Sequence, residues 1–461
     1  MGKKEFIDSL RSFYNHIRKK SLVPFDKNLP RKEEVLANLY SKIKNNTYQP
    51  SLPREYIISN KSNYVSRIIH KFTLEDYCTY FYCINMLQDC VCDIKDRTVG
   101  TFGGWSISNP IQSIDKIEKE NLISSCEWYE YVSVSSLTIS QWMKNWKEFS
   151  KLSYAKSIEY ESNQCATDYV VALFDIANFY DTIKLDILES KLRLKCNTAE
   201  KNKIIDLLIY FLRYWNKPFE GYFPKSCGIP QEETGDCSRI LANFYLRDYD
   251  KEIKKLCDDY NCDYLRFADD MTIFAPNRKI AEFILFEASK LLHRIGLNIN
   301  CSKVKFFNKQ EYQEYQAFEI LALLDENCSV KKIKQAIRLY FAYKDAGKDF
   351  RQDRVIRRFI SVLVEKKIKK LPKKYKEKIY CELLNQETLS TSNVYYLQKV
   401  YNIMKSEGLE KKLFEILDEL IPNINFNSFH YELLGFYKKI KRVGFDEQIL
   451  WDEINKRKII N

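Results

Sequence analysis

The chain has 461 residues, of which 45% are hydrophobic and 30% charged. This composition excludes a disordered polymer, and the length predicts more than one folded domain. The 74 basic and 62 acidic residues give a net charge of +12, which favours a polyanionic partner.

No apolar run approaches the roughly 18 residues that a membrane-spanning helix needs. The first residues, MGKKEF, also lack the apolar stretch of a secretory signal. We therefore expect no membrane partner.

Cysteine is frequent and histidine is rare, with 14 cysteines and 4 histidines. None of the cysteines falls in a Cys-x-x-Cys pair. This pattern predicts reduced core cysteines and argues against a structural zinc site.

The N-terminal part is expected to be mostly helical. Residues 1–50 contain two charged amphipathic stretches that are split at Pro24 and Pro30. A short strand is predicted at Tyr56–Ile58 and a buried helix at Leu74–Leu87.

The middle of the chain follows an irregular insertion at residues 100–165. Tyr169–Asp175 is a near-continuous apolar run with β-branched members, which predicts a buried strand. Tyr264–Phe274 is predicted to form strand, turn and strand, with Asp269 and Asp270 at the bend. Helices are predicted at 185–194, 203–214 and 280–292.

After residue 330, long stretches rich in Lys, Glu, Leu, Ile and Tyr alternate with short breaks. Successive amphipathic segments of this length favour a stacked helical domain. The expected helices are 331–345, 351–369, 373–386, 392–406, 409–420 and 427–440.

Three carboxylates stand at predicted strand ends. Asp175 and Asp269 are 269 − 175 = 94 residues apart, but an antiparallel sheet can juxtapose them, with Asp270 beside them. Clustered like charges raise one another's pKa unless a cation neutralises them, and carboxylates suit magnesium. Two such ions clamp an in-line phosphoryl displacement, which points to nucleotidyl transfer. The alternative is ordinary turn chemistry, because Asp favours such bends.

The order of four segments resembles the reverse transcriptases. Phe174–Ile183 resembles motif A, Gly228–Leu246 motif B, Phe267–Asp270 motif C and Gly296–Lys303 motif D. The resemblance covers about residues 50 to 310. It implies an α+β fold, with right-hand fingers and palm, an antiparallel palm sheet and an all-α, possibly repeat-like, C-terminal domain.

The resemblance also implies three domains. Residues 1–165 would form an N-terminal helical region and fingers with an insertion. Residues 166–310 would form the palm with motifs A to D and part of the fingers. Residues 311–461 would form an α-helical C-terminal domain that replaces or includes the thumb.

Carried over residue by residue, the resemblance makes Asp175 and Asp269 metal ligands and Asp270 the third carboxylate. The backbone carbonyl of Ile176 would be a further ligand. The implied cofactor is a pair of Mg²⁺ ions, with Mn²⁺ as the alternative.

For the incoming dNTP, Tyr180 matches the aromatic steric gate that excludes a ribose 2′-hydroxyl. Arg67 resembles the fingers arginine that grips the triphosphate, with Lys71 as a second candidate. Lys303 matches the motif D lysine, a proton donor to pyrophosphate. Gln231 would contact the nucleotide sugar. The alternatives are core packing for Tyr180 and solvated surface positions for the lysines.

Motif B departs from the commoner Pro-Gln-Gly pattern, because Gln231 is followed by Glu232 and Glu233. This departure puts the expected placement of Gln231 in question. Gly235–Ala242 is instead similar to the form found in abortive-infection and unknown-group bacterial reverse transcriptases, which act in phage defence. That similarity implies the bacterial cytoplasm, an RNA template or non-coding RNA, a DNA product and, in some relatives, a homo-oligomer.

The densest basic run follows in the helical part of the chain. Phosphate contacts from such lysines would strengthen nucleic-acid binding. The alternative is a solvated helix face with alternating Lys and Glu. The lysines concerned are Lys366, Lys367, Lys369, Lys370, Lys373 and Lys374.

Three functions remain open at this point. The first is an RNA-directed DNA polymerase of antiphage defence, working on a dedicated non-coding RNA. The second is untemplated or protein-primed DNA synthesis by the same active site. The third, of another class, is a catalytically silent nucleic-acid-binding scaffold, against which the retained carboxylates argue.

Overall fold

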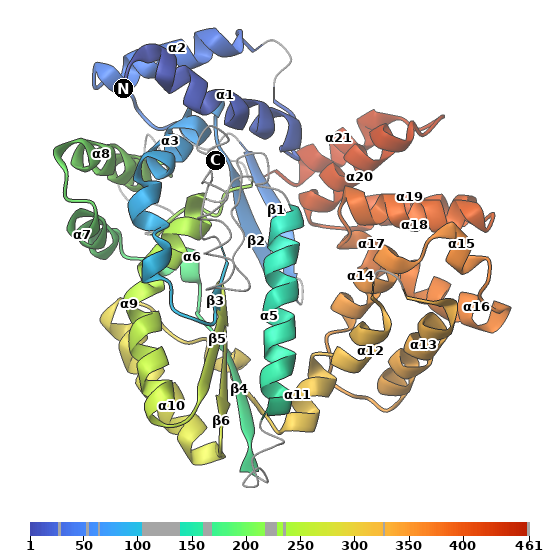
Figure 1. The fold of residues 1–461 in the computed structure, drawn as a ribbon. Helices are drawn as coiled ribbons and strands as arrows, with labels where there is room; N and C mark the ends of the chain where they lie inside the picture. Colours follow the sequence, from blue (N-terminus) through green and yellow to red (C-terminus); the bar gives the residue numbers. More distant parts are fainter. Residues whose placement is uncertain are drawn as a thin grey trace. The chain divides into compact units, whose positions relative to one another are not determined.

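The computed structural model describes residues 1–25, 29–51, 55–62, 65–103, 139–159, 168–216, 228–233, 237–325 and 328–458. The chain forms two compact units (Figure 1). The first unit comprises Met1–Arg54 and His70–Lys309, and the second unit comprises Glu55–Ile69 and Gln310–Asn461.

A five-stranded sheet organises the first unit, in the order β3-β5-β6-β4-β7. Its strands pair antiparallel, except that β3 runs parallel to β5. The predicted antiparallel sheet is therefore confirmed, with one parallel strand at its edge. The strands are β3 (Thr101–Phe102), β4 (Val170–Asp175), β5 (Asp263–Phe267), β6 (Asp270–Ala275) and β7 (Lys305–Phe307).

Helices surround this sheet, and α9, α10 and α5 contact its strands (Figure 1). Thr73, Thr198 and Asn277 each accept a backbone N–H bond at the start of α3, α8 and α10, which fixes where these helices begin. The helices are α1 (Lys3–Lys20), α2 (Lys32–Lys44), α3 (Leu74–Val91), α5 (Ile139–Glu159), α6 (Phe179–Thr182), α7 (Leu185–Lys195), α8 (Ala199–Tyr214), α9 (Cys237–Asp259) and α10 (Arg278–Arg294).

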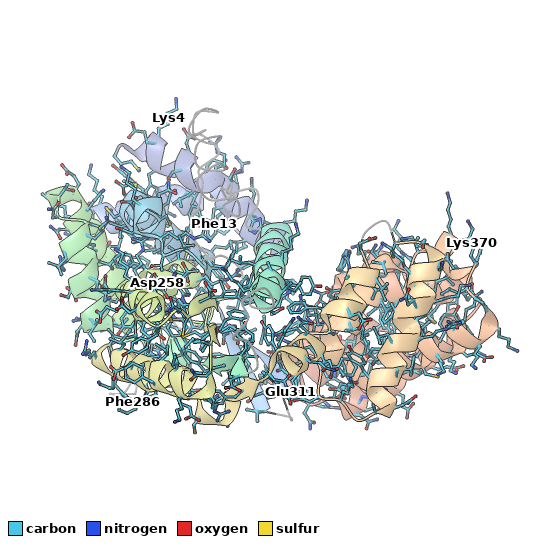
Figure 2. All side chains as sticks on the ribbon, turned by 60° about the horizontal axis from the view of Figure 1, so that its bottom comes forward. Lys4, Phe13, Asp258, Phe286, Glu311 and Lys370 are labelled. Carbon is cyan, nitrogen blue, oxygen red and sulfur yellow. The ribbon has the colours of Figure 1, made fainter. Side chains whose placement is uncertain are left out.

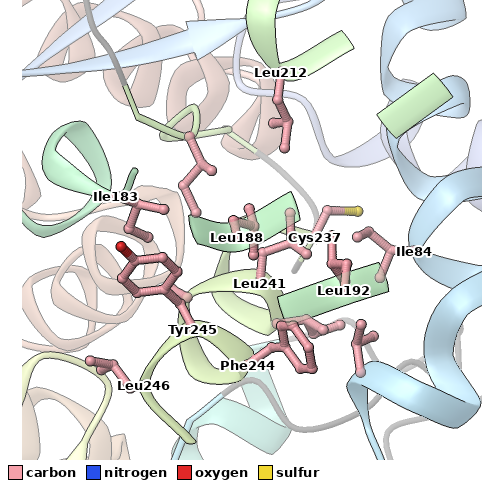
Figure 3. Close-up of a cluster of buried hydrophobic side chains, with 14 of the residues drawn as sticks. Ile84, Ile183, Leu188, Leu192, Leu212, Cys237, Leu241, Phe244, Tyr245 and Leu246 are labelled. Carbon is pink, nitrogen blue, oxygen red and sulfur yellow. The ribbon is translucent and has the colours of Figure 1, made fainter. Parts of the chain in front are cut away.

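The core of the first unit lies between α3, α7, α8 and α9. Figure 3 shows part of it, where Ile84 of α3, Leu188 and Leu192 of α7 and Leu241 of α9 converge. All four side chains are fully buried. This packing fixes α9, whose N-terminal half carries the motif B residues.

The second unit joins a β-hairpin to a set of helices. The hairpin strands are β1 (Glu55–Ser62) and β2 (Val65–Lys71), and β1 packs against α20. The Asn427 side chain makes this contact specific, because its Oδ1 accepts the Ile58 N–H at 2.7 Å and its Nδ2 donates to the Tyr56 carbonyl at 3.0 Å. Residues 55–69, which the sequence groups with the N-terminal region, thus belong to this unit.

From residue 310 on, the described residues form helices and the turns between them. Figure 2 shows the side chains, with Phe13 inside the first unit and Lys370 on the surface of the second. The helices are α11 (Lys309–Tyr315), α12 (Phe318–Leu323), α13 (Val330–Asp345), α14 (Gln352–Val362), α15 (Glu365–Ile368), α16 (Lys373–Leu383), α17 (Gln386–Ser390), α18 (Val394–Ser406), α19 (Glu410–Asn423), α20 (Asn427–Ile440) and α21 (Glu447–Lys456).

One helix prediction in this unit is wrong. The segment 351–369 is two helices, α14 and α15, because Leu363 and Val364 adopt extended backbone between them. Leu363 is almost fully buried there, so core packing outweighs the helical periodicity of the sequence. Strand β2 and helices α9 and α21 lie where no regular element was predicted.

Two further sequence expectations concern composition. Across the residues that the structure describes, no helix is both long and apolar enough to cross a membrane. The described cysteines are free, and most are buried. Burial raises the pKa of the Cys262 thiol to about 12, which makes it a poor nucleophile.

Candidate active site

The three predicted carboxylates come together at one end of the sheet. Asp175 ends β4 and pairs directly with Asp270, the first residue of β6. Directly paired residues place their side chains on the same face of a sheet. Asp269 precedes Asp270 in the β5–β6 turn, where Ala268 adopts a left-handed conformation with φ of +55°.

The electrostatics of this cluster are those of crowded like charges. Burial raises the pKa of Asp269 to about 7, and the charges of Asp270 and Asp175 add to the effect. Lys303 forms an ion pair with Asp175 Oδ2. Burial acts against the charge of Lys303, but its bond to Asp175 prevails and raises the lysine pKa.

Among the described residues, Lys303 leaves one oxygen of the cluster without a hydrogen bond. Asp175 is buried, and its Oδ1 accepts no hydrogen bond within the described part of the chain. Such an unsatisfied carboxylate oxygen is costly unless a cation or donor meets it. The donor set is oxygen only, which fits a hard divalent cation such as Mg²⁺. As they stand, no three His, Cys, Asp or Glu side chains among the described residues are close enough to hold a metal ion.

The carbonyl of Ile176, the next residue after Asp175, has a defined direction. Ile176 lies opposite Ile299, but the two residues do not bond to each other. The hydrogen bonds are made by their neighbours: the Ala177 N–H donates to the Asn298 carbonyl, and the Asn300 N–H donates to the Asp175 carbonyl, both at 2.8 Å. In an antiparallel ladder, the polar groups of such a residue point away from that partner. The Ile176 carbonyl therefore faces the side of β6 and its carboxylates.

A buried ion pair that we did not predict supports the turn. Arg266 of β5 is fully buried and makes a bidentate contact with Asp250 of α9, at 2.8 and 2.6 Å. Its third nitrogen donates to the Ala268 carbonyl at 2.6 Å and to Asn243 Oδ1 at 2.8 Å. Arg266 thus links α9 to the turn that carries Asp269. A charged residue inside the apolar run of β5 was the available signal for a buried partner.

Strand β3 supports the same turn from its other side. The Phe102 carbonyl accepts the Ala268 N–H at 3.2 Å, and the Gly100 carbonyl accepts the Arg266 N–H at 2.9 Å. Gly103 has φ of +128°, and a Cβ on it would lie 2.9 Å from Asn243 Nδ2. Glycine at this position therefore lets the chain approach the Asn243 amide.

Tyr180 lies half-buried on α6, five residues after Asp175. Its carbonyl accepts the Ile229 N–H at 2.9 Å. A Cβ on Gly228 would lie only 1.8 Å from that carbonyl oxygen, so only glycine permits this approach. Motif A and motif B are thereby tied together at the backbone of Tyr180.

The two acidic residues that distinguish motif B have structural partners. Glu232 Oε1 accepts the Ser238 N–H at 3.0 Å, in the first turn of α9, where the helix dipole favours a carboxylate. Glu233 accepts the Ser21 hydroxyl at 2.8 Å and the backbone N–H of Leu22. The preceding residue, Gln231, is half-buried and its carbonyl accepts the His70 N–H at 2.9 Å.

The two basic candidates for triphosphate binding have different settings. Lys71 is buried and donates to the carbonyls of Val23 and Pro24, at 2.7 and 2.9 Å. Its described contacts tie the N-terminal segment to β2. Arg67 is exposed on the part of β2 that belongs to the second unit.

The predicted basic run spans α15 and the start of α16. Lys369 pairs with Glu365 at 2.6 Å and Lys373 with Glu377 at 3.8 Å. Both pairs are exposed, as expected for a solvated helix face. The other lysines of the run are Lys366, Lys367, Lys370 and Lys374.

With this geometry in place, comparison with known proteins gives a consistent class. Residues 129–323 match the family model described as reverse transcriptase (RNA-dependent DNA polymerase), a range that contains all three carboxylates. Over 109 residues, the chain is 30% identical to the retron Ec83 reverse transcriptase of Escherichia coli. This match covers 23% of the chain and 32% of the relative, so it spans about a third of that protein's length.

Solved structures with similarity to the chain include two yeast telomerases. Truncated apo telomerase from Candida tropicalis is 14% identical, with a TM-score of 0.35 and coverage of 64% of this chain and 60% of that one. Telomerase from Candida albicans in complex with a fragment of telomeric RNA is 12% identical, with a TM-score of 0.35 and coverage of 98% and 71%. Residues 129–323 are thus similar to the reverse transcriptases, and the match to the retron enzyme agrees with this similarity.

The Arg266–Asp250 pair predicts a strongly non-additive double-mutant cycle. Arg266→Leu should lower the free energy of unfolding by about 3–5 kcal/mol, because it leaves Asp250 buried without its counter-charge. Asp250→Leu should cost a similar amount, and the double variant should cost much less than the sum. Urea denaturation of all four proteins at neutral pH measures this.

The exposed pair Arg278–Glu282, also 2.6 Å apart, is the matched control and should contribute less than about 1 kcal/mol. Additive effects of the Arg266 and Asp250 substitutions would contradict the assignment of a coupled buried pair.

The raised pKa of Asp269 predicts how stability depends on pH without metal. The carboxyl has a pKa of about 7 in the folded protein and about 3.9 when unfolded, so the folded state binds more protons between these values. Stability should therefore fall as the pH rises from about 4 to 7. Asp269→Asn should remove this decrease, giving a higher melting temperature than wild type at pH 8 in EDTA and a similar one at pH 5.

Asp259→Asn, an exposed change at the end of α9, serves as the control and should not alter the pH profile. Added Mg²⁺ should raise the melting temperature of wild type at pH 8 more than that of Asp269→Asn. Equal pH profiles for wild type and Asp269→Asn would show that Asp269 is not under this repulsion.

Proposed function

We propose that the protein is a reverse transcriptase of bacterial antiphage defence, which polymerises dNTPs on an RNA template by a two-metal mechanism. One observation carries the proposal. The segment that matches the reverse transcriptase family is the segment in which Asp175, Asp269 and Asp270 converge at the end of an antiparallel sheet. Retention of this mutually repulsive cluster argues against a silent scaffold.

In this proposal, Asp175, Asp269, Asp270 and the Ile176 carbonyl hold two divalent cations, Mg²⁺ or Mn²⁺. When bound, the cations neutralise the charge on the attacking and leaving oxygens of the phosphoryl transfer. The carboxylates must be ionised for this purpose, so activity should rise with pH through the pKa of Asp269. Lys303 gives a proton to the departing pyrophosphate, a role that its ion pair with Asp175 supports.

Nucleotide selection falls to residues around motif A and motif B. Tyr180 lies on α6, five residues after Asp175, and its ring crowds a ribose 2′-hydroxyl. Gln231 contacts the sugar from the motif B side, and Arg67 grips the triphosphate. Lys71 acts indirectly, since its ammonium holds the carbonyls of residues 23 and 24.

The proposed partners are an RNA, as template or dedicated non-coding RNA, and a DNA product. The motif B form supports membership of the abortive-infection and unknown-group enzymes, and with it the bacterial cytoplasm and a homo-oligomeric assembly. The basic run that begins at Lys366 would add phosphate contacts.

Replacing the motif C pair separates an enzyme from a scaffold. In the Asp269→Ala/Asp270→Ala variant, incorporation of labelled dNTP with Mg²⁺ should fall at least about 10³-fold, because the charge of the transition state is no longer stabilised. The Asp258→Ala/Asp259→Ala variant, which removes two charges from the end of α9, is the matched control and should retain activity. Incorporation that survives the motif C change would overturn the site.

Supplying each dNTP singly, with and without RNA, tests templating in the same assay. Incorporation that follows the RNA sequence supports an RNA-directed polymerase. Incorporation of any dNTP without RNA, or product covalently attached to the protein, would instead establish untemplated or protein-primed synthesis.

The gate assignment makes a separate prediction. Tyr180→Ala should admit ribonucleotides, lowering the preference for dNTP over rNTP by about 10-fold or more, because the ring no longer meets the 2′-hydroxyl. Tyr180→Phe keeps the ring and should keep the preference. Ratios of kcat/KM for dNTP and rNTP provide the measurement, and an unchanged ratio in Tyr180→Ala would remove the gate assignment.

A further inference from the structure

The surface formed by α14 and α18 in the second unit has an unusual charge balance. These two helices pack against each other (Figure 1). From Arg351 through the end of α14 there are four arginines and one acidic residue, Asp353. Helix α18 has two lysines and no acidic residue. These two segments together carry a net charge of +5, and one of the cations, Arg354, is half-buried and donates to Gln316 Oε1 at 3.2 Å.

Aromatic rings alternate with cations on this surface. The Arg357 guanidinium lies 5.8 Å from the centre of the Tyr396 ring, and Tyr396 meets Tyr395 edge-on at 5.3 Å. The Lys399 ammonium lies 5.6 Å from the centre of the Tyr395 ring. The four side chains form a continuous row from α14 across α18, which we call the Arg–Tyr row.

The row is exposed at Arg357 and Tyr395 and half-buried at Tyr396 and Lys399. Arg357 is exposed, and the Tyr395 side chain is 48% exposed although it is large and aromatic. Among the residues that the structure describes, no carboxylate lies within ion-pair distance of Arg357 or Lys399. The basic run at α15 and α16 differs, because Glu365 and Glu377 already pair with two of its lysines.

We infer that the Arg–Tyr row is a binding surface for single-stranded nucleic acid. Exposed aromatic rings offer stacking platforms for unpaired bases, and flanking cations contact the phosphates between them. The bases of a duplex are already stacked on one another and cannot stack on Tyr395. A duplex would therefore gain only the contacts between the cations and its phosphates. The inference depends on the second unit alone and extends the proposed function, which places nucleic acid at the carboxylates of the first unit.

The test measures binding of fluorescent oligouridylate and oligothymidylate to the full chain, in EDTA and without dNTPs. Arg357→Glu should weaken binding about 10-fold, and the log–log salt slope should become shallower by about 0.7 for each phosphate that the variant no longer neutralises. Tyr395→Leu should weaken binding about 10-fold without changing the salt slope, because it removes stacking and not charge. The tighter of the two oligonucleotides identifies RNA or DNA as the bound strand.

Two matched variants exclude a general effect. Lys411→Glu makes the same charge change at a 91% exposed residue of α19, and Tyr260→Leu removes a similarly exposed ring from the first unit. Both should bind nearly as wild type, and melting curves should show that all four variants fold. Photocrosslinking of 4-thiouridine-substituted RNA should label the peptide that contains Tyr395.

Equal weakening by Arg357→Glu and Lys411→Glu would overturn the inference, as would wild-type binding by Tyr395→Leu. Crosslinks confined to the first unit would overturn it as well. Because no catalysis is required, a protein that fails to incorporate dNTPs would still give the expected binding result, so the two proposals fail separately.

Discussion

Mutual repulsion among three clustered carboxylates, of which Asp175 is buried and Asp270 is exposed, is the constraint that the first unit must satisfy. Asp175, Asp269 and Asp270 sit at one end of a sheet, where burial and then the charges of its two neighbours raise the pKa of Asp269. Left alone, such a cluster would push its strands apart or take up protons. Asp269 does bind its proton more tightly here, while the surrounding structure holds the backbone in place.

Positive charge reaches this region from two directions and for two purposes. Behind the turn, Arg266 binds Asp250 and the Ala268 carbonyl, so it fixes the backbone and not the carboxylates themselves. Beside the carboxylates, Lys303 pairs with a single oxygen of Asp175 and leaves the other without a donor. Arg266 therefore stabilises the backbone of the site, whereas Lys303 contacts the carboxylates directly.

Much of this site could be predicted because its residues coincide with the ends of strongly patterned elements. The apolar run that ends in Asp175 and the hairpin around Asp269 follow directly from hydrophobic periodicity. The partner of Arg266 could not be predicted, because periodicity indicates that a residue is buried and not which residue it meets. The same limit applies to Glu232 and Glu233, whose partners lie in α9 and in residues 21–23.

In the second unit, local pattern gave the helices but not their breaks or their assembly. The helix ends at Leu363 because burying that side chain in the core requires extended backbone there. The helical spacing of the sequence does not indicate this. The bond between Asn427 and Ile58 of β1 joins segments 369 residues apart. Periodicity describes only neighbouring residues, so it cannot predict a contact between such distant segments.

Ala268 shows that this protein has not been optimised for stability alone. Alanine in a left-handed conformation costs roughly 1 kcal/mol that glycine at the same position would avoid. Glycine, however, would give the unfolded and partly opened chain more freedom at the residue that precedes Asp269. The methyl group thus restricts the motions of the turn in advance, so that ligand binding beside Asp269 would cost less conformational entropy.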